Sequence, residues 1–163
     1  MRSVTIRAAM QVLLKHIATL GPIGYIPFAP GTFGTLAALI CVLLMSLSLH
    51  AHFVFFVSVT IIGSFAATAA EKALGQKDSG RIIIDEFAGF LIATFYVPHS
   101  PTLLISAFII FRFFDILKPL MIRKLESTLN KGVGVMADDI LAGIYTNILL
   151  QAYVHLLRTE LIT

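Results

Sequence analysis

The chain has 163 residues, of which 58% are hydrophobic and only 13% charged, with a formal net charge of +3. Soluble domains are about 45–50% apolar, so this composition predicts an integral membrane protein. No linker or repeat divides the chain, which favours a single domain over residues 1–163. The small, dispersed charge argues against nucleic-acid binding, and the single cysteine, Cys41, excludes an intrachain disulfide.

The N-terminal twenty residues are hydrophobic, but they differ from a signal peptide. Arg7, Lys15 and His16 interrupt the apolar run, and no clear small-residue cleavage site follows. We therefore interpret this segment as mature sequence. Apolar residues recur in it at helical spacing, which predicts either an amphipathic helix on an anionic membrane surface or a helix packed on the rest of the protein.

A Gly/Pro-rich loop is predicted at residues 21–35, followed by five apolar segments. These segments cover residues 34–49, 53–70, 82–97, 102–117 and 135–157. They lack the period-2 alternation of strands, so the predicted fold is all-α: an integral membrane bundle of about five apolar helices with an amphipathic N-terminal helix. Because several runs are shorter than the ~20 residues that span a bilayer, some are expected to be re-entrant or buried in the bundle.

Basic residues indicate the orientation. If the apolar segments alternate in direction, one side collects Arg2, Arg7, Lys15, Lys72, Lys77, Arg81, Lys118, Arg123, Lys124 and Lys131. The turns on the other side, at residues 50–52 and 98–101, contain histidine but no lysine or arginine. The positive-inside rule places the basic side in the cytoplasm.

Acidic residues gather on the same predicted side, at the ends of the apolar segments. The group comprises Asp85, Glu86, Asp115, Asp138 and Asp139. A charge in hydrocarbon costs at least about 2.5–3.5 kcal/mol, so such a cluster indicates a function. Converging carboxylates need a cation, and oxygen ligands favour Mg²⁺, Mn²⁺ or Ca²⁺. The five histidines are expected in surface turns or at helix ends, away from this cluster, which argues against zinc.

Phosphate-binding groups accompany the acids. The PGTFGT motif at residues 30–35 offers backbone N–H groups at two glycines and the hydroxyls of Thr32 and Thr35. Arg112 can grip a phosphate through two nitrogens, and Lys118 lies on the same helical stripe. Each feature also has a structural interpretation as a turn, an ion pair or a helix-dipole partner. Together they predict metal-assisted phosphoryl chemistry on a lipid headgroup, by hydrolysis or by transfer.

Four motifs follow one another along the chain: PGTFGT (30–35), DEFAG (85–89), FRFFDILKP (111–119) and GVGVMADDILAG (132–143). In this order and at these intervals they resemble the bacterial phosphatidylglycerophosphatase A family over about residues 20–150. The resemblance implies an all-helical, Mg²⁺-dependent phosphatase of the bacterial inner membrane that converts phosphatidylglycerophosphate to phosphatidylglycerol and phosphate. Thr35, where serine is common in the family, and residues 131–134, which replace a paired glycine, depart mildly from the pattern.

The resemblance also implies roles for individual residues. The metal candidates are Asp85, Glu86, Asp115, Asp138 and Asp139, and Asp85, Glu86 and Asp139 are in addition the catalytic candidates. The phosphate candidates are Thr32, Thr35, Arg112 and Lys118. The expected mechanism is direct attack by an activated water, since the chain lacks both a CxxxxxR and a DxDxT/V motif.

Two other functions stay open at this point. A lipid phosphotransferase would also use aspartates and Mg²⁺, but the chain lacks the DGxxAR run of that family. A non-enzymatic ion-coupled transporter would place its polar residues near the middle of the bilayer rather than at one end. The oligomeric state is not predicted.

Overall fold

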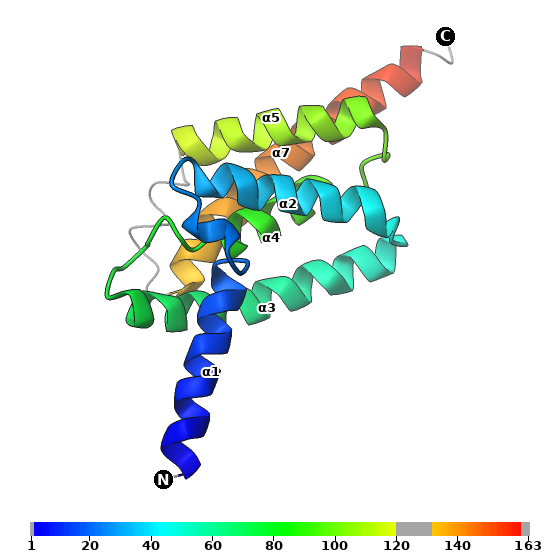
Figure 1. Ribbon diagram of the computed structural model, residues 1–163. Coiled ribbons are helices and arrows are strands. Elements are labelled where there is room, and N and C mark those ends of the chain that lie inside the picture. The colour runs from blue at the N-terminus through cyan, green and yellow to red at the C-terminus, as the bar shows by residue number, and fades with distance from the viewer. Residues whose placement is uncertain (1, 120–131, 161–163) are drawn as a thin grey trace.

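The computed structural model describes residues 2–119 and 132–160, and these residues form helices without a strand (Figure 1). This confirms the predicted all-α class. The helices are α1 (Arg2–Ala18), α2 (Pro30–Met45), α3 (Leu49–Leu74), α4 (Ile84–Ala93), α5 (Pro101–Leu117) and α7 (Gly132–Glu160). A short 3-10 turn, η1 (Ile23–Tyr25), precedes α2.

Helix α4 lies at the centre of the bundle, where it packs against α2, α3, α5 and α7. Only ten residues of the predicted apolar segment 82–97 are helical. At 1.5 Å per residue this is about 15 Å, half of the roughly 30 Å hydrocarbon core. Most of its side chains are buried, including Phe90 and Leu91. This segment is therefore enclosed by the other helices rather than exposed along its length.

The end of α4 is fastened to α7 by two side-chain amides. Asn147 Nδ2 donates to the carbonyls of Ala93 (3.1 Å) and Phe95 (2.6 Å). Gln151 Nε2 donates to the carbonyls of Phe95 (3.2 Å) and Tyr96 (3.0 Å). Hydrocarbon offers no hydrogen bonds, so a helix that ends inside a membrane bundle needs such protein partners for its last carbonyls.

Glycines allow α4 and α7 to touch backbone to backbone. A Cβ atom added at Gly143 would lie 2.2 Å from the Gly89 carbonyl oxygen, and one added at Gly89 would lie 2.5 Å from the Asp139 carbonyl oxygen. Small residues at such positions let neighbouring helices in a membrane protein approach closely. The contact brings the first turn of α4 beside the part of α7 that carries Asp139.

The predicted loop at residues 21–35 is wrong in its second half, because α2 already begins at Pro30. Proline suits the first turn of a helix, where its missing N–H has no helical partner to lose. The PGTFGT motif therefore forms the first turns of α2. Gly34 in this motif faces a neighbouring backbone, since an added Cβ would lie 2.9 Å from the Ile83 carbonyl oxygen.

Large apolar side chains cover the outer surfaces of the helices. Four examples, all more than half exposed, are Ile61 and Phe65 on α3, Ile109 on α5 and Ile148 on α7. Two of the described helices, Leu49–Leu74 and the Gly132–Leu157 part of α7, are long and apolar enough to cross a membrane, whereas α2 is a shorter apolar helix. This outer surface is typical of a membrane protein.

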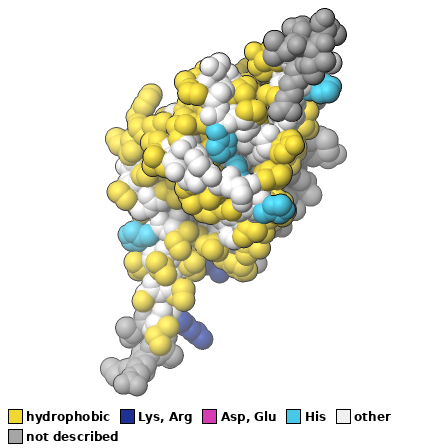
Figure 2. Space-filling model, turned by 90° about the vertical axis from the view of Figure 1, so that its right-hand side faces the viewer, with side chains coloured by type: hydrophobic (Ala, Val, Ile, Leu, Met, Phe, Trp, Pro, Cys, Tyr) yellow, Lys and Arg dark blue, Asp and Glu magenta, His cyan; other side chains and the backbone are white. Residues whose placement is uncertain are grey.

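Two turns form the end of the bundle at the right of Figure 1: residues 46–48, between α2 and α3, and residues 94–100, between α4 and α5. Both turns line one cleft through Leu47 and His99. Figure 2 faces this end and shows hydrophobic and histidine side chains, with no acidic side chain visible among the described residues. The starts of α2 and α4 lie at the opposite end of the bundle.

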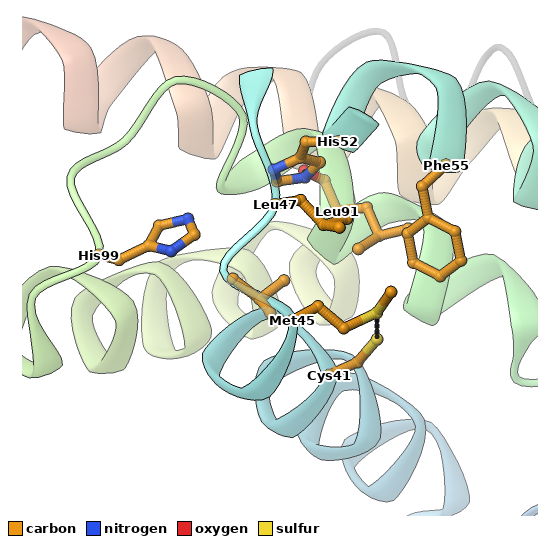
Figure 3. A pocket seen from close by; sticks show the side chains of 8 residues that line it. Cys41, Met45, Leu47, His52, Phe55, Leu91 and His99 are labelled. Atoms are coloured by element: carbon orange, nitrogen blue, oxygen red, sulfur yellow. Dashed lines mark hydrogen bonds between the residues drawn. The ribbon is translucent and has the colours of Figure 1, made fainter. Parts of the chain in front are cut away.

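His52 lies in the first turn of α3, at a helix end as the sequence predicts, and its side chain is buried. Its Nε2 donates to the Leu91 carbonyl (2.9 Å), and its ring meets Phe95 edge-on. Figure 3 shows His52 in a small pocket with Met45 and Cys41, whose thiol contacts the Met45 sulfur at 3.2 Å. The histidine anchors α3 to α4 here, far along α4 from its first turn.

Candidate active site

Three carboxylates converge at the end of the bundle where α4 begins. Asp85 and Glu86 occupy the first turn of α4, and Asp139 comes from α7. One oxygen atom from each lies within 4.8 Å of the others. Asp85 and Asp139 are buried, and Glu86 is partly buried. Within residues 2–119 and 132–160, this is the one group of His, Cys, Asp or Glu side chains close enough to share a metal ion.

The environment of these carboxylates opposes their simultaneous ionisation. Asp85 and Asp139 are only 7% and 4% exposed, so little solvent reaches these two carboxylates. Carboxylates that share a site repel one another unless protons or a cation intervene. Glu86 Oε2 is buried and has no hydrogen-bond partner among the described residues, so this donor set fits a hard divalent cation.

Arg112 on α5 links the cluster to two other helices. Its Nη1 lies 2.5 Å from Asp115 Oδ2, 3.8 Å from Glu86 Oε1 and 3.5 Å from the Thr35 hydroxyl. The guanidinium Nε is buried and makes no hydrogen bond within the described part of the chain. One side chain thus connects α2, α4 and α5 beside the three carboxylates.

The two remaining acids form ion pairs. Asp138 accepts a short hydrogen bond from Lys118 Nζ, and Asp115 pairs with Arg112. Both acids lie within electrostatic range of Asp139. The structure thus brings all five predicted acids together, with three of them at metal-sharing distance and two held by cations. Lys118 follows α5 in a left-handed conformation (φ 43°), and its backbone N–H donates to the Phe114 carbonyl.

The two predicted threonines differ in their surroundings. Thr35 is fully buried, and its hydroxyl donates to the Gly31 carbonyl (3.0 Å) while it faces Arg112. This geometry orients Arg112 rather than presenting a free hydroxyl to a ligand. Thr32 lies in the first turn of α2 and is partly exposed, with no side-chain hydrogen bond to the described residues.

Gly31 has a steric role that the sequence analysis missed. A Cβ added there would lie 1.9 Å from Glu86 Oε1 and 3.2 Å from Arg112 Nη1. Glycine in a helix is unfavourable unless another group needs the space. That signal was hidden because residues 30–35 were interpreted as a loop, in which glycine is ordinary.

Thr68 is a second residue that the sequence analysis did not single out. Its hydroxyl accepts a hydrogen bond from the backbone N–H of Gly132 (3.1 Å), and a Cβ at Gly132 would lie 2.3 Å from the Ser64 carbonyl oxygen. These contacts dock the start of α7 on α3, which positions Asp138 and Asp139. Nothing in the apolar run around Thr68 distinguishes it from other threonines in helices.

Comparison with known proteins agrees with the motif resemblance. The family model for phosphatidylglycerophosphatase A matches residues 16–154. Phosphatidylglycerophosphatase A of Haemophilus influenzae is 38% identical over 151 residues, covering 85% of this chain and 93% of the relative. Phosphatidylglycerophosphatase A of Escherichia coli is 36% identical over 123 residues, covering 74% and 72%.

A Bacteroides thetaiotaomicron protein provisionally named phosphatidylinositol-3-phosphatase is 40% identical over 136 residues, covering 78% of this chain and 84% of the relative. No solved structure matches the chain. The family model spans far more than half of the chain, and it includes all five clustered acids together with Arg112 and Lys118. This chain belongs to the phosphatidylglycerophosphatase A family.

Proposed function

We propose that this protein is a phosphatidylglycerophosphatase, which hydrolyses phosphatidylglycerophosphate to phosphatidylglycerol and phosphate in phospholipid biosynthesis. Two relatives carry the name of this activity. The observation that carries the proposal is the group of Asp85, Glu86 and Asp139 beside Arg112, at one end of an apolar bundle. Carboxylates and a guanidinium there suit a charged headgroup whose acyl chains stay in the lipid.

Mg²⁺ is the proposed cofactor, and Asp85, Glu86 and Asp139 would hold it. When bound, the ion supplies charge neutralisation for the phosphate group. Asp115 and Asp138, which the sequence also suggests as metal ligands, are proposed instead to hold Arg112 and Lys118 in place. The support for this division is that each already pairs with its cation.

Side chains of the protein bind the phosphate and transfer the protons. Arg112 binds the phosphomonoester and stabilises the negative charge that develops on its oxygens. Thr32, at the start of α2, offers a hydroxyl to the same phosphate. One of the three converging carboxylates accepts a proton from the attacking water as the oxygen–phosphorus bond forms. The bond from phosphorus to the glycerol oxygen breaks, and that oxygen takes up a proton to leave phosphatidylglycerol.

The proposed location is the bacterial inner membrane, with the carboxylates facing the cytoplasm and α1 on the membrane surface. In this arrangement α2, α3, α4, α5 and α7 form the embedded apolar bundle. Lys72 in the last turn of α3 and Lys77 and Arg81 between α3 and α4 support the orientation, because the opposite turns lack lysine and arginine. Three further predicted cytoplasmic cations, Arg123, Lys124 and Lys131, lie outside the described residues.

The test is phosphate release by the purified protein in detergent. We expect Mg²⁺-dependent release from phosphatidylglycerophosphate, loss of release with a chelator, and weak release from glycerol 3-phosphate. Faster release from phosphatidylinositol 3-phosphate would reassign the substrate, which the Bacteroides relative makes a necessary comparison. Absence of release from every phosphomonoester would reject the phosphatase and leave the phosphotransferase or the transporter.

Asp85→Asn should abolish phosphate release while the protein stays in the membrane fraction. Asparagine keeps the shape of the side chain but removes the negative charge that the cation needs. Asp78→Asn is the matched control, because Asp78 is exposed in the turn before α4 and asparagine tolerates its left-handed backbone (φ 49°). Near-normal turnover in the Asp85 variant would remove this residue from the site.

A further inference from the structure

A cleft of about 430 Å³ opens between the segment that leads into α2 and the turn that leads into α4. Its lining includes Tyr25, Pro27, Pro30, Gln76, Ser79 and Arg81. None of these residues belongs to the carboxylate cluster, and the mechanism above gives none of them a role. The cleft combines polar groups with the face of an aromatic ring.

Both walls of the cleft run directly into the candidate active site. Pro30 precedes Gly31, the residue whose added Cβ would meet the Glu86 carboxylate. Arg81 lies four residues before Asp85. Consecutive Cα atoms are about 3.8 Å apart, so the Cα atoms of Arg81 and Asp85 are at most about 15 Å apart, and the cleft adjoins the candidate active site.

Two cations lie beside the ring of Tyr25: Arg81, which lines the cleft, and Lys15 of α1, which is not one of its lining residues. Arg81 Cζ lies 5.4 Å from the ring centroid, and Lys15 Nζ from α1 lies 6.0 Å from it. Within the described part of the chain neither cation pairs with a carboxylate. Contact with the ring restrains the guanidinium and the ammonium while their positive charge stays available. A site with these groups selects an anion, and phosphate oxygens suit both side chains.

The headgroup proposed as substrate carries two phosphates joined by a glycerol. One is the phosphodiester next to the acyl chains, and the other is the terminal phosphomonoester that is hydrolysed. We infer that the cleft is a second phosphate subsite, where Arg81 and Lys15 bind the phosphodiester while the phosphomonoester occupies the carboxylate cluster. This inference rests on the proposed function, and it restricts the substrates to lipids that bear both phosphate types on one polyol.

Inhibition by the two products distinguishes the two subsites, because phosphatidylglycerol retains the phosphodiester and inorganic phosphate does not. In Arg81→Gln, we expect KM for phosphatidylglycerophosphate and the inhibition constant for phosphatidylglycerol to rise about tenfold, the change that corresponds to roughly 1.4 kcal/mol. The value of kcat and the inhibition constant for inorganic phosphate should not change. Lys15→Gln should act in the same direction, and Arg81→Lys should recover part of the loss.

Lys77→Gln is the matched control, since Lys77 is an exposed cation in the same turn that does not line the cleft. An equal effect of Lys77→Gln would overturn the inference by showing that surface charge alone is responsible. An unchanged KM in Arg81→Gln and Lys15→Gln would also overturn it, as would weaker inhibition by inorganic phosphate. If the unaltered protein releases no phosphate from phosphatidylglycerophosphate, the proposed function fails and the subsite fails with it. Melting temperatures identify any variant that is merely unfolded.

Discussion

At the scale of single residues, the cationic side chains of the candidate active site each form an ion pair with a neighbouring carboxylate. Arg112 contacts Asp115 and Glu86, while Lys118 holds Asp138. Buried charges persist only when partners or a metal compensate them, so each of these side chains constrains the next. A small displacement of one carboxylate should therefore disturb the whole group.

Gly31→Ala should reduce kcat for phosphate release by about 100-fold, since misplacing catalytic groups by about 1 Å costs that much. The reason is that the new methyl group would lie 1.9 Å from Glu86 Oε1 and must displace the carboxylate. The initial rate with phosphatidylglycerophosphate measures the effect. Gly34→Ala shows the effect of a clash away from the carboxylate, because its methyl group would lie 2.9 Å from the Ile83 carbonyl oxygen and should lower the melting temperature more than kcat. Equal activity of both variants would contradict the role of Gly31.

The sequence identified the clustered acids because carboxylates are rare in apolar helices. It could not tell which acids share a cation site, since neighbours such as Asp138 and Asp139 point about 100° apart on a helix. The structure separates them: Asp139 joins Asp85 and Glu86, whereas Asp138 pairs with Lys118. That choice depends on how α4, α5 and α7 are rotated against one another, which no local pattern encodes.

At the scale of elements, the contact between α4 and α7 determines how near Asp85 and Asp139 come. Their backbones approach at Gly89 and Gly143 without intervening side chains. In an apolar environment such packing relies on close van der Waals contact rather than on the hydrophobic effect. Any side chain at these positions should separate the two helices and their carboxylates together.

Gly143→Ala should lower the free energy of unfolding by about 1–3 kcal/mol, the usual cost of overpacking a tight contact. Phosphate release should fall as well, because the methyl group would lie 2.2 Å from the Gly89 carbonyl oxygen. Thermal unfolding in detergent and the initial rate provide the two measurements. Ile148→Ala removes an exposed side chain from the same helix and should change neither by much. Wild-type stability of the Gly143 variant would refute the tight contact.

The apolar runs located the helices but not their ends. Ile82, Ile83 and Val97 are buried without being part of α4, because hydrophobicity reports burial rather than helical backbone. Helix α3 begins at Leu49 and reaches Leu74, beyond the predicted 53–70, because helices continue through polar residues such as Glu71. The capping serine Ser48, which accepts from the Ala51 N–H, marks the true start.

At the scale of the whole molecule, polar chemistry and basic charge lie at one end of the bundle and histidine-bearing turns at the other. The carboxylate cluster and Arg81 are at the first end, and His99 is at the second. Apolar surfaces between the ends fit a bilayer. A protein with polar ends and an apolar middle should expose its two ends on opposite sides of the membrane.

Cysteine labelling tests this arrangement, since the chain has the single cysteine Cys41. In a Cys41→Ser background, His99→Cys should react with a membrane-impermeant maleimide from the periplasmic side, and Lys77→Cys should react only after the inner membrane is opened. Both residues are exposed, so accessibility to the reagent is matched. Labelling of both from the same side would contradict the proposed orientation.

The close packing of α4 against α7 also limits the routes by which a lipid with two acyl chains can reach the carboxylates. Asn147 bonds the carbonyl of Ala93, the last residue of α4, Gln151 bonds carbonyls of the turn that follows, and the two helices touch at their glycines. We therefore expect a lateral path from the bilayer to open between α2 and α5, which pack against each other less extensively than α4 and α7 do. Arg112 of α5 reaches Thr35 of α2 across this contact and also lies near Glu86 of α4, so separation of α2 from α5 would shift the guanidinium as the substrate enters.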